Sequence, residues 1–168
     1  MKPLLGSLLF SLFVPGTFFL LLPYLLVAAG QPLPAFLAVW TGYFGLLLAA
    51  IGVWVYLWAM ISFLIRGKGT PAPTAPPVHF VATGPYRYVR NPMYLSGMVI
   101  LSGEALFFRS PYLLLYMALL FALLHAFVVL YEEPRLKQRF GAEYESYLER
   151  VPRWIPYKIR QVWQRYSG

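Results

Sequence analysis

The 168-residue chain contains no cysteine and no aspartate. The absence of cysteine excludes disulfide bonds, thiolate metal sites and a cysteine nucleophile. A Gly-x-Gly-x-x-Gly fingerprint is also missing, which excludes the soluble dinucleotide-binding architecture. The absence of aspartate means that any carboxylate chemistry must use one of six glutamates: Glu104, Glu132, Glu133, Glu143, Glu145 and Glu149.

Charge is scarce as well. Only 12% of the residues are charged, whereas 60% are hydrophobic. A soluble domain carries roughly twice that charged fraction. This composition predicts an all-α, polytopic integral membrane protein whose spans leave no room, within these residues, for a separate soluble catalytic domain. An active site would therefore be built from helix ends and short loops.

Four apolar stretches are expected to cross the membrane, followed by an interfacial helix at about residues 132–152. The stretches are about Leu4–Ala29, Leu33–Ile65, Pro92–Phe108 and Pro111–Tyr131. The first is too long for a signal-peptide core and is expected to be retained. The second exceeds one crossing, and a tilt or a break is expected near Gly42 and Gly45. We expect one membrane domain over residues 1–168, made of spans in 1–65, a proline-rich loop and motif in 66–91, a helical hairpin in 92–131 and a tail in 132–168.

Basic residues predict the orientation of these spans. If Lys2 faces the cytoplasm, every other lysine and arginine except Arg109 also falls on the cytoplasmic side. The protein is therefore expected to be multi-pass with both termini cytoplasmic. A basic collar beside anionic headgroups accounts for the net charge of +8, so no nucleic-acid partner is expected.

Two polar motifs flank the hairpin: GPYRYVRNPMY at residues 84–94 and YEEP at 131–134. The apolar stretch between them is long enough for two crossings of roughly twenty residues each, so the hairpin returns the second motif to the level of the first. At about 1.5 Å per residue, Tyr94 and His125 lie at nearly equal depth. His125 and Glu132 are two helical turns apart and are expected to share a face.

Each motif also has a simpler interpretation. Glu132 and Glu133 are plausible membrane-boundary charges, Arg87 and Arg90 plausible topological anchors, and the tyrosines a plausible interfacial aromatic belt. His125 is plausible as a buried histidine bonded to neighbouring backbone. Taken together, however, a dense polar cluster at membrane depth indicates a functional site.

The ordered pair GPYRYVRNPMY and LYEEPRLKQRFGAEYESYLERVP resembles the integral membrane methyltransferases that include isoprenylcysteine carboxyl methyltransferase and phosphatidylethanolamine N-methyltransferase. The resemblance covers about residues 78–156. It implies S-adenosylmethionine bound at the cytoplasmic end of the hairpin, and methyl transfer to a lipid or prenylated substrate that enters sideways from the bilayer. No metal is implied.

The resemblance also implies roles for individual residues. It places Arg150 in an Arg-Val-Pro element that contacts substrate. Position 91 is asparagine, as in the phospholipid enzymes, whereas the carboxyl methyltransferases have histidine there. Position 128 is valine, whereas the carboxyl methyltransferases have a substrate-binding arginine there. The expected cofactor contacts are Phe80, Val81, Gly84, Tyr86, Arg90, Asn91, Pro92, Tyr94, Glu132 and Glu133.

The chemistry of the residues agrees with a sulfonium methyl donor. Glu132 can accept hydrogen bonds and offset positive charge, while Arg90 or Asn91 can bind a carboxylate. Arg90 and His125 are the catalytic candidates, with His125 as the base if the nucleophile is an ammonium that must first lose a proton. A carboxylate nucleophile needs no base. The alternative function is a non-catalytic membrane subunit or a small transporter.

Overall fold

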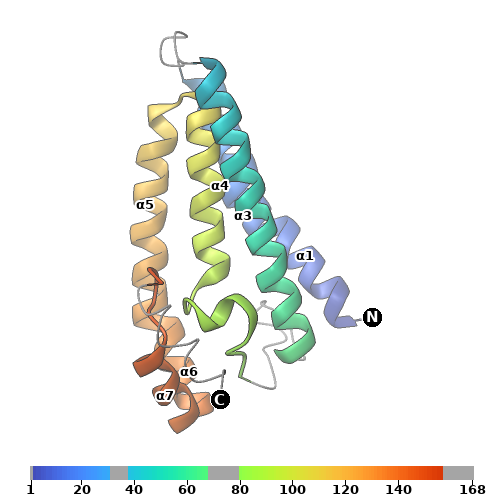
Figure 1. Cartoon of the computed structure of the whole chain (residues 1–168), viewed down its shortest axis with the longest axis vertical. Coiled ribbons are helices and arrows are strands. Elements are labelled where there is room, and N and C mark those ends of the chain that lie inside the picture. The colour runs from blue at the N-terminus through green and yellow to red at the C-terminus, as the bar shows by residue number, and fades with distance from the viewer. Residues whose placement is uncertain (1, 31–37, 68–79, 157–168) are drawn as a thin grey trace, which may run out of the picture.

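The computed structural model describes residues 2–30, 38–67 and 80–156, and all regular elements in these ranges are helical (Figure 1). The elements are α1 (Lys2–Gly16), η1 (Thr17–Leu21), α2 (Leu22–Ala29), α3 (Ala38–Gly67), η3 (Gly84–Arg87), α4 (Pro92–Phe108), α5 (Pro111–Phe127), η4 (Val128–Glu132), α6 (Glu133–Phe140) and α7 (Ala142–Arg150). The predicted all-α polytopic membrane architecture is confirmed. The proline-rich link at residues 68–78 lies outside the described residues.

Three helical segments are long and apolar enough to cross a membrane: Leu12–Ala29, Val39–Gly67 and Pro111–Phe140. Helix α4 is apolar but has only 17 residues. The long segments expose large apolar side chains, as lipid-facing helices do; Leu115 and Trp40, for example, are 61% and 79% exposed. The count of four crossings stays a prediction, with α4 as the short member.

The first span is interrupted by a wider turn. Pro15 lies near the end of α1, and the π-helical turn η1 follows it before α2 begins. Proline removes one backbone donor, and its ring clashes with the carbonyl four residues earlier. A π turn is one way for a helix to continue past such a defect. The Thr17 hydroxyl donates to the Phe13 carbonyl, 2.5 Å away, and satisfies one backbone acceptor at this point.

Of the tilt or break expected near the glycines of the second span, the break does not occur, and the tilt stays a prediction. Helix α3 is continuous through Gly42 and Gly45. A Cβ at Gly45 would lie only 2.6 Å from the Gly103 carbonyl of α4. Small residues let helix backbones approach closely where side-chain packing, rather than the hydrophobic effect, drives association in lipid. Gly45 therefore serves close packing of α3 against α4 rather than a bend.

Helices α3, α4 and α5 run side by side, with α4 in the middle (Figure 1). The turn from α4 to α5 uses Arg109 in the left-handed conformation, at φ 53°. Between the helices, Met98 and Leu101 of α4 pack with Leu120 of α5 in a buried apolar cluster. This cluster holds the hairpin together, and the hairpin brings the two polar motifs to the same end of the bundle.

The tail after the hairpin differs from the single interfacial helix that we predicted. Helix α5 continues through η4 into α6, and the chain breaks at Gly141, whose φ is 52°. That left-handed value favours glycine, which has no Cβ penalty there. The break turns α7 back, so that Tyr144, Tyr147 and Val151 form a second buried cluster.

Candidate active site

The two sequence motifs meet at one end of the bundle, at the bottom of Figure 1, which we call the motif end. The first motif starts at Gly84, where φ is 61° and η3 begins. A Cβ at this position would clash with the Ser62 hydroxyl of α3, so glycine is needed both for the backbone conformation and for the close approach. The turn η3 is thereby held against the end of α3.

The motif then leads into α4 through Asn91 and Pro92. Pro92 is buried and occupies the first turn of α4, where its missing N–H leaves no helical hydrogen bond unmade. Asn91, 8% exposed, does not cap the helix with its side chain. Its amide donates instead to the backbone carbonyl of Arg153, 3.3 Å away. The start of α4 is thus tied to the segment that follows α7.

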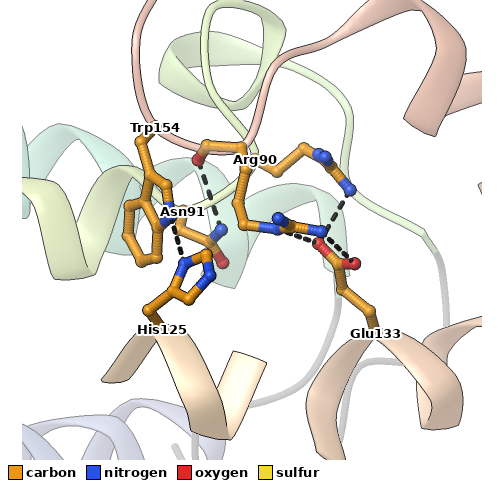
Figure 2. Close-up of polar contacts among 6 residues, drawn as sticks. Arg90, Asn91, His125, Glu133 and Trp154 are labelled. Carbon is orange, nitrogen blue, oxygen red and sulfur yellow. Dashed lines mark hydrogen bonds and ion pairs between the residues drawn. The ribbon is translucent and has the colours of Figure 1, made fainter. Parts of the chain in front are cut away.

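Glu133 is the centre of the polar cluster (Figure 2). Arg90 Nη1 lies 2.7 Å from Glu133 Oε1, and Arg153 Nε and Nη2 donate to Oε1 and Oε2 at 2.8 and 2.9 Å. The Glu133 side chain is only 12% exposed. Hydrogen bonding to Glu133 raises the pKa of Arg153 above its usual value. One buried carboxylate of α6 is therefore joined to the connection between η3 and α4 and to the segment after α7.

Glu132 has a different partner. The Tyr94 hydroxyl of α4 donates to Glu132 Oε2 at 3.0 Å. Register alone placed Tyr94 level with His125, but side chains lean toward the N-terminus of their helix, which for α4 is the motif end. The Tyr94 hydroxyl therefore reaches Glu132. A single hydrogen bond leaves most of the acceptor capacity of the carboxylate unused.

The π turn η4 lies between α5 and α6. It spans Val128–Glu132, and α6 begins with Glu133 and Pro134. Pro134 cannot donate to the carbonyl of Leu130. The expected common face of His125 and Glu132 assumed an uninterrupted α-helix. A π turn changes the angle between residues around the helix axis, so residues seven apart across it no longer share a face. In the structure Glu132 contacts Tyr94, whereas His125 contacts the segment after α7.

Arg153 is the site residue that sequence reasoning missed. The sequence predicts a substrate contact at Arg150. In the structure Arg150 is exposed on α7, and its Nε donates to the Ser146 carbonyl one turn earlier. Arg153 follows the end of α7 and reaches Glu133. The feature of the sequence that could indicate Arg153 is the helix end at Val151-Pro152, because a residue beyond a helix end is free to turn back toward the bundle.

Aromatic residues surround the cluster on the side of α7. Phe80 packs edge-on against Tyr144 and Tyr147, with ring centroids 5.5 and 4.9 Å away. The Tyr147 hydroxyl donates to the Tyr86 carbonyl at 2.6 Å. Burial raises the pKa of Tyr144 to about 12 and raises that of Tyr147 further. These phenols therefore stay protonated at physiological pH. Val81, on the same segment as Phe80, is buried.

His125 faces the same end of the hairpin (Figure 2). Trp154 Nε1 donates to His125 Nδ1 at 3.0 Å. The indole ring also packs on Phe121, one turn earlier on α5, with centroids 5.1 Å apart. His125 therefore has a side-chain partner rather than the backbone partner that we had considered.

Within the part of the chain that the structure describes, two buried polar atoms at the motif end have no hydrogen-bond partner: Arg90 Nε and Thr83 Oγ1. Buried polar groups are rarely left unpaired unless a ligand or water completes them. Arg90 Nε is a charged donor suited to a carboxylate, and Glu132 is an acceptor suited to an ammonium or a ribose diol. The residues present therefore fit a ligand with both kinds of group.

Comparison with curated proteins finds a relative that matches most of the chain. The nickel-cobalt-cadmium resistance protein NccN of Alcaligenes xylosoxydans xylosoxydans is 30% identical over 115 residues, which are 68% of this chain and 48% of that protein. The chain thus spans about half the length of this curated relative. No solved structure matches the chain.

A profile of the phospholipid methyltransferase family matches residues 40–143, more than half of the chain. The matched segment includes both polar motifs and the hairpin between them. It ends before Arg153 and Trp154. The family predicted from the two motifs is confirmed. The chain belongs to the phospholipid methyltransferase family.

Proposed function

We propose that the protein is an S-adenosylmethionine-dependent methyltransferase that acts on a lipid or prenylated substrate at the cytoplasmic membrane interface. The observation that carries this proposal is that two adjacent glutamates, Glu132 and Glu133, have different hydrogen-bond partners. Glu133 is paired with Arg90 and Arg153, whereas Glu132 accepts one hydrogen bond from the described residues, donated by Tyr94. A half-buried carboxylate is thus held at the motif end with acceptor capacity left for a cationic ligand.

The cofactor would lie between the two motifs. Glu132 would face its positive groups or ribose hydroxyls. Arg90 Nε, which is buried and has no partner among the described residues, would donate to its carboxylate. Asn91, Pro92 and Tyr94 would form the α4 side of the site. The other proposed contacts are Phe80, Val81, Gly84, Tyr86 and Glu133, with Glu133 acting by holding Arg90 in place.

Catalysis here requires mainly alignment and the exclusion of water. When bound, S-adenosylmethionine supplies an activated methyl group for in-line transfer. The chain's own residues would hold the nucleophile in line with that group, which contributes strongly to rate when the geometry is fixed. A site at the end of an apolar hairpin also keeps bulk water from the reacting atoms. If the nucleophile is an ammonium, His125 remains the predicted base; Arg150 remains a predicted substrate contact.

The proposal is tested with S-adenosylmethionine labelled in its methyl group and membranes from cells with and without the protein. We expect label in extracted lipid only when the protein is present. Mild alkaline treatment then distinguishes the products, because a methyl ester releases its label as methanol whereas an N-methyl group keeps it. A purified protein that binds neither S-adenosylmethionine nor its demethylated product would contradict the proposal and favour a non-catalytic subunit or a transporter.

The proposal that the motif end faces the cytoplasm leads to a topological prediction. We expect a cysteine introduced as Ala72→Cys, in the link between α3 and the first motif, to face the cytoplasm because of the basic residues on both sides of the link. The chain has no other cysteine, so labelling is specific. An impermeant thiol reagent should react in inverted vesicles and not in intact cells. Labelling from outside intact cells would reverse the orientation.

A further inference from the structure

The segment after α7, residues 151–155, forms a strap across the motif end. The Arg90 N–H donates to the Pro152 carbonyl at 2.9 Å, and the Asn91 amide donates to the Arg153 carbonyl. The Arg153 side chain adds the two hydrogen bonds to Glu133. These contacts hold the backbone of the strap against the start of α4. The position of the next residue, Trp154, is therefore set by the strap.

Trp154 determines which nitrogen of His125 carries the hydrogen. An indole N–H is only a donor, and it points at His125 Nδ1 from 3.0 Å. Nδ1 must therefore offer its lone pair. A neutral imidazole has one N–H, so the hydrogen of His125 is on Nε2. Among the described residues, Trp154 is the hydrogen-bond partner of His125.

The charged groups near this pair have other partners. Glu133, from α6, is paired with Arg90 and Arg153, and Glu132, from η4, accepts the Tyr94 hydroxyl. Neither carboxylate is bonded to His125. The tautomer of the imidazole therefore depends on Trp154, whose indole ring is held in turn against Phe121.

We infer that Trp154 is a positioning residue that fixes His125 as a hydrogen-bond donor, through Nε2–H, toward an acceptor oxygen of the lipid headgroup. A base must present a lone pair, and the lone pair of His125 is taken by Trp154 in this arrangement. The inference rests on the proposed function and narrows it, because it favours a substrate oxygen beside His125 over an ammonium that gives up a proton there.

The tautomer itself can be measured without any substrate. Protein labelled with ¹⁵N-histidine has only two imidazoles, at positions 79 and 125, and His79→Gln identifies the signals of His125. We expect an unprotonated Nδ1 and a protonated Nε2 in the unmodified chain. Trp154→Phe keeps an aromatic ring but removes the donor, so it should yield a mixture of tautomers. Trp40→Phe, at an exposed position on α3, is the matched control and should change nothing.

A protonated Nδ1 in the unmodified chain, or a Trp154→Phe spectrum identical to the original, would overturn the inference. Either result leaves the proposed function untouched, because the measurement needs no turnover. Conversely, absent methyl transfer by the unmodified protein would contradict the proposed function while the tautomer is still observed.

Kinetics then separate the donor role from the base role. With Trp154→Phe, we expect the KM for the lipid to rise roughly 2- to 10-fold, the effect of one weakened neutral hydrogen bond, with cofactor affinity unchanged. His125→Gln removes the imidazole but can still donate from its amide, so the KM for the lipid should rise by a similar factor and the shape of the pH profile between pH 6 and pH 9 should stay the same. A loss of about 10² to 10⁴-fold with His125→Gln, together with a changed pH profile, would establish His125 as the base instead.

Discussion

Glu133→Gln is expected to destabilise the protein more than the loss of any other glutamate. The substitution keeps the shape of the side chain but leaves Arg90 and Arg153 without a counter-charge, and these side chains are only 13% and 28% exposed. Removing one partner of a buried ion pair costs about 3–5 kcal/mol. We expect a value toward the lower end, because Arg153 is partly exposed. The Tm in detergent, followed by tryptophan fluorescence, should fall clearly.

The matched control is Glu143→Gln, an exposed glutamate on the first turn of α7. Its Tm should be nearly unchanged. A double variant that combines Glu133→Gln with Arg153→Gln should lose less stability than the sum of the single changes, because the second change removes one of the uncompensated cations. If Glu133→Gln has the same Tm as the Glu143 control, the cluster does not hold the strap to the bundle.

Glu132→Ala is expected to abolish most cofactor binding without unfolding the protein. Glu132 is half-buried and bonded to Tyr94 alone among its described neighbours, so its loss removes one hydrogen bond within the protein. A hydrogen bond to a charged group contributes about 1.5–3 kcal/mol, so affinity for S-adenosylmethionine should fall by roughly 10- to 100-fold or more. Isothermal titration in detergent measures this directly. The Tm should stay far above that of Glu133→Gln.

Tyr94→Phe is the companion variant, because it removes the hydroxyl that orients Glu132 and keeps the ring. A smaller loss of affinity than with Glu132→Ala is expected, since the carboxylate itself remains. Unchanged affinity in Glu132→Ala would remove Glu132 from the proposed site. A fall in Tm as large as that of Glu133→Gln would show that both glutamates are structural.

The sequence by itself determined the membrane architecture and the meeting of the two motifs. Hydropathy is a property of composition over many residues, so a long apolar run predicts a span whatever its neighbours are. The meeting of the motifs follows from the length of the hairpin, and the family is carried by the short motifs themselves. The residues concerned, Arg90, Tyr94, Glu132 and Glu133, lie together as expected.

The pairing among these residues was decided only by the tertiary structure. The π turn from Val128 to Glu132 changes the direction in which the side chains of the two glutamates point. The seven-residue spacing between His125 and Glu132 does not reveal this turn. Gly45 could equally mark a bend or a close approach until its neighbour Gly103 is known. In both cases the outcome depends on what packs on the other side of the helix.

The strap is the clearest case of contacts that the sequence alone does not predict. Arg153 and Trp154 lie in a short non-helical segment with no periodic pattern, yet they supply the counter-charge of Glu133 and the partner of His125. Their placement depends on hydrogen bonds to backbone carbonyls of the strap from the Arg90 N–H and the Asn91 side-chain amide, more than sixty residues earlier in the chain. Local sequence patterns predict helices and membrane spans, because helices and spans depend mainly on residues that are neighbours in the chain. Contacts between distant segments depend on the packed fold, and only the fold assigns them.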